Sequence, residues 1–443
     1  MYGMRSTGKT VILRQLAGRE EFLAQSAYLT LNYGEHSITE IYKWIGNLIK
    51  TGIKYFYIDE ITWADGFVDM AMELADVWAS YEGVKIMLSG TDSLAFTFAK
   101  QESLHGRYEQ FSTTQMSYPE YLRIIKGNTL DFVLLKGNIL DYVHCGGVFW
   151  KKTRPGRDEY TEYLESGVVW NIYNSILNTR RKTMLGEEIR FVSLKELFSI
   201  CNGICNCVAA QYLYTHAQDA GGEPLVNALD TVLQNCGIAI PPAEASGIFP
   251  PVFKSETSVY EKEKVDSVIE IMRKIEFLTD IEIHSESGTK IIPMFAQTSV
   301  AHEFAYSALR AVLKSQTPRN FELLNFIEEY IDGELLDSAC ILTFGKDYLS
   351  VSKYRSNAGD DEIDIVAFDN RTHILYLYEI KRGLKTKTEY AKHLKKNYLV
   401  EALLEKYGTT DVKKAVLYRG DYTIPPKNDI PYYKIEDYLA TYL

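Results

Sequence analysis

Glycine, lysine and threonine stand near the start of the chain at a spacing suited to binding phosphate. Gly3, Gly8, Lys9 and Thr10 fit the pattern G-x-x-x-x-G-K-[ST], and an apolar helical segment, residues 11–16, follows directly. Glycines let backbone amides approach phosphate oxygens, and the N-terminus of the following helix adds partial positive charge. The lysine can reach the β- and γ-phosphates, and the threonine hydroxyl can ligate Mg²⁺. The pattern predicts a phosphate-binding loop, and a plain glycine-rich turn is the alternative.

Two neighbouring acids end the apolar segment at residues 53–61. A segment of this kind is typical of a buried parallel strand. At the end of such a strand, Asp59 can hold the Mg²⁺ shell, and Glu60 can orient or polarise an attacking water. One acid at a strand exit is common, but Asp-Glu in this order after a phosphate loop favours nucleotide hydrolysis.

Further polar residues follow the next predicted strand, residues 84–88. Thr91 or Ser93 is placed to sense a γ-phosphate, and Thr91 is the predicted residue. Arg107, which follows a glycine, is either a finger that stabilises transition-state charge or an ordinary surface arginine, and the sequence leaves both open.

A second set of charged residues lies on two predicted strands near the C-terminal end. Glu379 and Lys381 are two residues apart on the strand at 373–381, so they share a face. Asp364 lies on a segment with strict alternation, and it can point to the same cleft. Two carboxylates can hold one or two Mg²⁺ ions that activate water. The lysine would position the water or neutralise the developing charge.

Asp337 supplies a further acid from a predicted helix that includes residues 333–337. As a bare pattern, Asp…Glu-x-Lys is weak, because charges often alternate on an edge strand. Here, however, Glu379 follows three apolar or aromatic residues, where a charge is costly. A local basic face suits phosphate contact, with a solvated helix as the alternative. It comprises Lys381, Arg382, Lys385, Lys387, Lys392, Lys395 and Lys396.

Alternating helices and strands would position both sets of residues, which indicates α/β architecture. In the N-terminal part, the predicted strands are residues 27–32, 53–61 and 84–88, and the predicted helices are 38–50 and 67–81. In the C-terminal part, a helix precedes strands at 348–352, 362–368 and 373–381, and a helix at 389–406 precedes a strand at 414–418.

The middle of the chain suggests a winged helix. Two helices flanking a turn at Asn202-Gly203 have helix-turn-helix spacing, and strands at 276–283 and 291–295 could form the wing. The second helix carries no basic residue, so packing against protein is favoured over reading DNA. Residues 159–183 are predicted to be helical before this segment, and residues 301–313 after it.

Bulk composition excludes several classes of protein. The 443 residues carry a net charge of −11, so the whole surface is not a generic polyanion binder. No secretion signal or membrane-spanning run is recognisable. Six cysteines without disulfide-like regularity fit a reducing cytoplasm. Cys201, Cys205 and Cys207, with His216 downstream, could hold a metal, but small apolar residues packed inside helices are the favoured interpretation.

Residues 1–150 resemble bacterial and archaeal AAA-type ATPases that are often paired with a nuclease-like domain. The resemblance rests on the loop Gly3–Thr10, on Ile58–Ile61, on Gly106-Arg107 before Tyr118–Tyr121, and on a lid turn at Tyr142–Gly147. Residues 321–443 resemble the PD-(D/E)XK nuclease fold, in which Asp337 occupies the usual place of a helix glutamate. The loop begins at residue 3, so most of the strand that should deliver it is absent, and an upstream start is one expectation.

The predicted fold class is α/β: a P-loop NTPase sheet, a helical lid, a winged-helix middle and a restriction-endonuclease-like domain. The predicted domains are an ATPase core at 1–126, a lid at 127–190, a winged-helix-like domain at 191–318 and a nuclease-like domain at 319–443. Predicted nucleotide-binding residues are Gly3, Ser6, Thr7, Gly8, Lys9, Thr10, Asp59 and Thr91. Predicted catalytic residues are Glu60, Arg107 and Lys381, and predicted metal ligands are Thr10, Asp59, Asp337, Asp364 and Glu379.

The expected function is that of a cytoplasmic ATPase that binds ATP and Mg²⁺ and is coupled to a domain that binds or cuts DNA. The alternative is a nucleotide-gated switch or scaffold whose nuclease-like domain is silent and binds DNA or a partner protein. Net acidity and the charge-poor second helix favour this alternative slightly. A damaged or wrongly bounded gene product is a third possibility. A protein partner or homo-oligomer is expected, and a membrane is not.

Overall fold

The protein is described by a computed structural model. It describes residues 1–4, 7–32, 34–81, 83–93, 95–96, 99, 108–113, 115–127, 139–145, 162–170, 172–173, 193–214, 226–227, 231, 260–306, 321–345, 349–357, 361–383, 391–420, 424–426 and 429–441. The chain divides into two compact units. The first unit comprises residues 1–115, 161–199 and 266–277, and the second comprises 116–160, 200–265 and 278–443.

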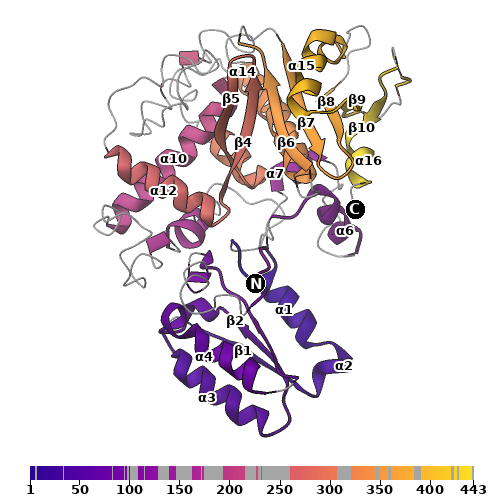
Figure 1. Ribbon diagram of the computed structural model, residues 1–443. Helices are drawn as coiled ribbons and strands as arrows, with labels where there is room; N and C mark the ends of the chain where they lie inside the picture. The colour runs from indigo at the N-terminus through magenta and orange to yellow at the C-terminus, as the bar shows by residue number, and fades with distance from the viewer. Residues whose placement is uncertain are drawn as a thin grey trace. The chain divides into compact units, whose positions relative to one another are not determined.

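A parallel sheet of three strands is the centre of the first unit (Figure 1). Its order is β1 (Ser26–Thr30), β2 (Tyr55–Asp59) and β3 (Lys85–Leu88). Helix α1 (Lys9–Ala17) packs on β1 and β2, whereas α3 (Ile38–Ile49) and α4 (Phe67–Ser80) pack together across the sheet (Figure 1). Two short helices, α2 (Glu20–Leu23) and η1 (Ile61–Trp63), also belong to this unit. The predicted alternation of helix and strand is confirmed.

The sequence explains why α3 forms and how it packs. Ser37 caps it with a capping box, in which Glu40 N–H donates to Ser37 Oγ and Ser37 N–H donates to Glu40. Ile38, Ile41 and Ile45 recur at helical spacing and are buried in the same core as the β2 side chains. Burial of this apolar stripe fixes α3 against the sheet that carries the two acids.

Tyr2 takes the position of a strand beside β3. It forms parallel bridges with Gly90 and Ser112. Its N–H donates to Phe111 O at 3.0 Å, and its carbonyl accepts from Thr113 N–H at 2.7 Å. Strand β3 therefore lies between β2 and Tyr2, and the predicted phosphate loop starts from this position in the sheet.

A sheet of seven strands forms the second unit (Figure 1). Its order is β10-β9-β8-β7-β6-β4-β5. The strands are β4 (Leu278–Ser285), β5 (Gly288–Phe295), β6 (Leu349–Arg355), β7 (Glu362–Asp369), β8 (Ile374–Lys381), β9 (Val412–Tyr418) and β10 (Tyr432–Lys434). β7 pairs antiparallel with β6 and β8, whereas β8 pairs parallel with β9. The strands predicted around Asp364 and Glu379 are confirmed.

Helices cover both faces of this sheet. Leu375 and Leu377 of β8 share a core with α15 (Asn397–Tyr407). Tyr378 of β8 stacks instead on Phe344 of α14 (Phe321–Phe344), with ring centroids 5.1 Å apart. Because successive side chains of a strand point to opposite faces, α14 and α15 lie on opposite sides of the sheet. The predicted helix at 389–406 begins later, at Asn397, after a 3-10 turn, η5 (His393–Lys395).

Three shorter helices of the second unit pack on one another or on α14. α7 (Ile139–Cys145) contacts α14, and α6 (Tyr118–Gly127) contacts α7 and α16 (Ile435–Ala440). Tyr142, part of the predicted lid turn, stacks edge-on against Tyr118 and donates to Met116 O at 2.7 Å. The glycines of that turn, Gly146-Gly147, lie outside the described residues. The π-helical turn η2 (Leu164–Val169) belongs instead to the first unit, as do residues 266–274 of α12 (Lys262–Lys274).

The predicted turn at Asn202-Gly203 is wrong, because α10 (Leu194–Tyr214) is one continuous helix. Ile200, Ile204 and Val208 are fully buried along it. Their burial outweighs the roughly 1 kcal/mol cost of a glycine inside a helix. The helix also buries Cys201, Cys205 and Cys207, and burial raises the pKa of Cys201 to about 12. This agrees with the apolar interpretation, whereas His216 lies outside the described residues.

The two predicted wing strands form a hairpin that belongs to the large sheet. β4 and β5 pair antiparallel, and β4 also pairs parallel with β6 through residues 282–284. The hairpin therefore extends the sheet of the second unit instead of forming the wing of a separate domain. Sequence periodicity identified the strands but not their neighbour, because pairing with β6 joins segments about 70 residues apart.

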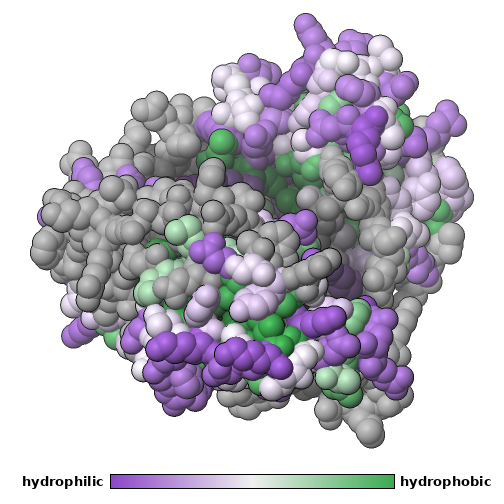
Figure 2. Space-filling view, turned by 60° about the horizontal axis from the view of Figure 1, so that its bottom comes forward, coloured by the Kyte–Doolittle hydropathy of each residue, from purple (hydrophilic) through white to green (hydrophobic). Residues whose placement is uncertain are grey.

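Hydrophilic and hydrophobic side chains are interspersed on the face of the molecule shown in Figure 2. On helix α1 of the first unit, Leu13 is buried, whereas Val11 and Ile12 are 52% and 38% exposed. Within the described ranges, we find no helix whose length and apolar content would suffice to span a bilayer.

Candidate functional site

The predicted phosphate loop contains two glycines whose φ angles are positive, a region that L side chains rarely adopt. Gly3 has φ of 148°, and a Cβ there would lie 2.2 Å from the carbonyl oxygen of Thr113. Gly8 has φ of 89° and is the N-cap of α1. A side chain would be strained at either position, so the loop requires glycine at both. Ser6, predicted to belong to the loop, lies outside the described residues.

Lys9 is folded back onto this loop. Its ammonium, in a residue that is 5% exposed, donates to Gly3 O at 2.8 Å and to Met4 O at 2.6 Å. Thr7 Oγ1 also donates to Met4 O, at 2.8 Å. The carbonyls are neutral acceptors, so an anionic phosphate would be a stronger partner for the same ammonium. Thr10, the predicted Mg²⁺ ligand, is half-buried in the first turn of α1.

Asp59 and Glu60 have separate hydrogen-bond partners. Asp59 is 1% exposed, and it accepts from Tyr28 OH at 3.0 Å and from Ser89 Oγ. Glu60 has φ of 60°, a left-handed conformation unusual for glutamate, and it accepts from both N–H and Oγ1 of Thr91 at 3.2 and 3.0 Å. Strained backbone of this kind is frequent at functional sites.

Burial raises the pKa of Glu60, and the nearby charge of Lys9 opposes this effect. A raised pKa brings a carboxylate closer to the range in which it can accept a proton from water near neutral pH. Lys9, Asp59, Glu60 and Thr91 thus lie at the carboxyl ends of β2 and β3 and at the start of α1. Arg107 lies outside the described residues.

The structure brings Asp364, Glu379 and Lys381 together in the second unit. Lys381 Nζ donates to Glu379 Oε2 at 2.8 Å and to Asp364 Oδ2 at 3.4 Å. The same oxygen of Asp364 accepts from Ile380 N–H at 2.6 Å. The lysine ammonium therefore lies between the two carboxylates that were predicted to hold Mg²⁺.

A β-bulge orients Asp364. Ser352 pairs with Val366 and Tyr354 pairs with Ile363, so Asp364 and Ile365 both lie opposite the single residue Lys353. The strict alternation predicted for β7 is therefore wrong at this point. Ile363 and Val366 both belong to the core beside α15, although they are three residues apart. The direction of the Asp364 side chain is therefore set by the bulge and not by simple alternation.

Glu379 is the most constrained acid of this set. The residue is 2% exposed, and its buried Oε1 has no hydrogen-bond partner in the described part of the chain. Burial and the neighbouring charge of Asp364 together raise the pKa of Glu379 to about 8, although Lys381 opposes both effects. A cation next to Oε1 would satisfy this atom and favour the ionised form. The donor set of carboxylate oxygens also suits Mg²⁺.

Asp337 has a partner that the sequence analysis missed. Lys353 Nζ of β6 donates to Asp337 Oδ2 at 2.6 Å, and both side chains are largely buried. Burial raises the pKa of Asp337, although Lys353 opposes this shift and Asp364 reinforces it. The sequence does show a lysine within a strand in which polar and apolar residues alternate. It does not show the partner of this lysine, because the packing of α14 on β6 brings Asp337 to it.

Asp337, Asp364 and Glu379 are the predicted metal ligands of the second unit. They lie near one another but do not form a closed cluster. Among the residues that the structure describes, the set of His, Cys, Asp and Glu whose ligand atoms all lie within 4.8 Å is a different one, treated below. Lys381 and Lys353 instead neutralise Asp364, Glu379 and Asp337.

The predicted basic face is partly paired. Arg382 forms an ion pair with Glu329, and Lys396 forms one with Asp361. Lys385 and Lys387 lie outside the described residues. The positive charge available to a phosphate backbone is therefore lower than the sequence alone indicates.

The first unit combines a parallel sheet, a glycine loop and an acid pair at the end of its middle strand. Residues 1–122 of the 443-residue chain match the family model of an AAA domain. No curated protein matches the sequence. Among solved structures, the Aeropyrum pernix Orc1 protein in complex with DNA is similar at 15% identity, over 70% of this chain and 87% of that chain. The TM-score of this similarity is 0.23.

Proposed function

We propose that the N-terminal unit binds and hydrolyses Mg·ATP and that it controls a metal-dependent DNA-binding or DNA-cleaving domain. The observation that carries the first part is the convergence of Lys9, Asp59, Glu60 and Thr91 at one edge of a parallel sheet. Ligands of open α/β sheets bind at the carboxyl ends of the strands. The match of residues 1–122 to an AAA domain supports this assignment.

Each residue has a defined part in the proposed hydrolysis. Lys9 exchanges the carbonyls of Gly3 and Met4 for phosphate oxygens. Thr10 and Asp59 would hold Mg²⁺, which neutralises phosphate charge when it is bound. Glu60 accepts a proton from the attacking water, and Thr91 holds its carboxylate in place.

ATP turnover and ATP binding test this proposal separately. Lys9→Ala removes charge-assisted hydrogen bonds worth about 1.5–3 kcal/mol, so we expect ATP affinity to fall about 10- to 100-fold. Glu60→Gln should bind ATP but hydrolyse it about 100- to 10,000-fold more slowly. Glu35→Gln changes an exposed acid of the same unit and is the matched control. Unchanged turnover in Glu60→Gln would contradict the assignment.

For the second unit, we propose a Mg²⁺-dependent phosphodiesterase site that acts on DNA. Asp364 and Glu379 would hold the metal, Asp337 would add a ligand, and Lys381 would neutralise charge on the scissile phosphate. The buried, unpartnered Oε1 of Glu379 supports a cation at this place. A metal held there supplies an activated water and stabilises the leaving oxygen.

Nicking of supercoiled plasmid tests the second part. We would compare the intact protein with Asp364→Ala and Lys381→Ala, in Mg²⁺ or Mn²⁺, with and without ATP. Loss of nicking in both variants, with nicking retained in Lys413→Ala, would support the site. Lys413 is an exposed lysine of the neighbouring strand β9 and is the matched control.

A second candidate function is a nucleotide-gated switch whose second unit has no nuclease activity, and a specific observation favours it. Lys353 and Lys381 already neutralise the acids, and the acids are not gathered within ligand distance. ATP turnover without nicking in any metal would favour this function. The second unit would then bind DNA or a partner protein without cutting.

A further inference from the structure

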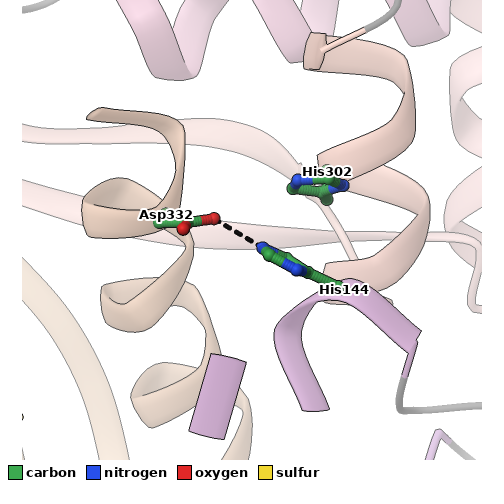
Figure 3. Close-up of side chains that lie close together, drawn as sticks. All are labelled: His144, His302 and Asp332. Carbon is green, nitrogen blue, oxygen red and sulfur yellow. Dashed lines mark hydrogen bonds and ion pairs between the residues drawn. The ribbon is translucent and has the colours of Figure 1, made fainter. Parts of the chain in front are cut away.

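Two histidines and an aspartate from three helical segments meet in the second unit (Figure 3). His144 lies on α7, His302 on the helical residues 298–306, and Asp332 on α14. One ligand atom from each residue lies within 4.8 Å of the other two. Residues far apart in sequence thus present nitrogen and oxygen donors to one point.

The contacts within this cluster leave one ring nitrogen unsatisfied. His144 Nε2 lies 2.6 Å from Asp332 Oδ1. The rings of His144 and His302 lie face to face, with centroids 4.1 Å apart and planes tilted by 36°. His302 Nε2 is buried and has no hydrogen-bond partner among the residues that the structure describes. A buried polar atom without a partner is costly, so its retention needs an explanation.

The chemistry of these donors selects a class of ligand. A neutral imidazole carries a lone pair on one ring nitrogen, and this nitrogen can coordinate a metal. Two imidazoles and a carboxylate suit Zn²⁺ and its neighbours, whereas Mg²⁺ and Ca²⁺ prefer oxygen ligands alone. An organic cation would gain no such coordinate bonds.

The segments that carry the donors are firmly packed. α7 contacts α14, and Val143, Ile331 and Leu335 are buried beside the donors. Asp332 is itself 7% exposed. Ligand atoms around a tetrahedral Zn²⁺ are about 3.3 Å apart, so the donors need only approach each other through side-chain rotation.

We infer that His144, His302 and Asp332 bind one divalent transition-metal ion of the Zn²⁺ class. The ion would join α7, the helical segment 298–306 and α14, with water in the remaining coordination position. The role is structural, because it fastens three helical segments whose donors come from distant parts of the sequence. Asp337 lies five residues beyond Asp332 on the same helix, so the ion would also steady the helix that carries this acid.

A simpler interpretation is an ion pair between His144 and Asp332 with His302 stacked on it. That arrangement accounts for the 2.6 Å contact but leaves His302 Nε2 without a partner. The two interpretations differ in whether His302 matters for metal affinity.

The test is Zn²⁺ titration of the full-length protein, stripped of metal, against a chromophoric chelator. Co²⁺ in place of Zn²⁺ gives visible absorption bands that report nitrogen and oxygen ligands. We expect one tightly held equivalent in the intact protein, and affinity at least about 100-fold lower in His302→Ala and Asp332→Asn. His36→Ala removes an exposed histidine of the first unit and should change nothing.

Circular dichroism and His302→Gln keep the test decisive if the alanine variant is unstable. A folded His302→Gln protein that has lost the Zn²⁺ equivalent supports the site. An intact protein that holds no equivalent of Zn²⁺, or a folded His302→Gln protein that holds it as tightly as the intact one, overturns the inference. A rise in the melting temperature of the intact protein on adding Zn²⁺, absent in His302→Gln and Asp332→Asn, would support the structural role.

Discussion

Lys353 is the cation that neutralises Asp337, and replacing it with methionine isolates the energetic role of this pair. The two side chains are 2.6 Å apart and largely buried. Lys353→Met keeps the length of the side chain and removes its charge. Because the variant leaves Asp337 buried without its ammonium, we expect the free energy of unfolding to fall by about 3–5 kcal/mol.

Mg²⁺ distinguishes a metal site from a purely structural ion pair. If Asp337 ligates Mg²⁺, the ion supplies the charge that the variant has lost. We then expect saturating Mg²⁺ to stabilise Lys353→Met by about 2 kcal/mol more than it stabilises the intact protein, equivalent to roughly 30-fold tighter binding. If the second unit is silent, Mg²⁺ will stabilise neither protein.

Urea unfolding followed by circular dichroism, in chelator and in Mg²⁺, measures both effects. The double variant Asp337→Asn with Lys353→Met is the control, since it removes both charges. We expect it to recover most of the lost stability, because replacing both members of a buried pair is often neutral. A loss below about 1 kcal/mol in Lys353→Met, or an equally unstable double variant, would refute the reasoning.

Three further predictions concern the loop, a buried histidine and a helix cap. Gly3→Ala forces a Cβ against Thr113 O, so ATP affinity should fall at least about tenfold in a fluorescent-nucleotide assay, while Gly46→Ala, with open space around it, should not change it. His284 is buried, and burial lowers its pKa from 6.5 to about 4, so the unfolded chain binds a proton that the folded chain does not. Stability should therefore fall by about 3 kcal/mol between about pH 6.5 and 4, and His284→Gln should lack this part of the slope in urea titrations. Ser37→Ala should cost about 1 kcal/mol in the thermal unfolding of the first unit.

Local sequence pattern was sufficient to predict the strands and which residues of one strand share a face. The two-residue spacing of Glu379 and Lys381 predicted their shared face, and they are 2.8 Å apart. The loop glycines and the Asp-Glu pair likewise carry their information in a few adjacent positions. These features could be predicted from the sequence because each depends on backbone geometry within one element.

The remaining features depend on contacts between distant segments. No local signal shows that Lys353 meets Asp337, since this follows from α14 packing on β6. The bulge that directs Asp364 arises from the register of β6 and β7. Gly203 was expected to end a helix, but burial of its neighbours overrides local propensity.

In both candidate sites, a lysine is bound to groups of the protein and would change partners when the proposed ligand binds. Lys9 donates to neutral carbonyls, so an incoming phosphate offers it a better partner. Lys381 donates to two carboxylates, and Mg²⁺ must compete with it for the same oxygens. A DNA phosphate would give Lys381 a new partner and free the carboxylates for the metal. It follows from the proposed function that Mg²⁺ and DNA bind the second unit cooperatively, each raising the affinity for the other by the same factor.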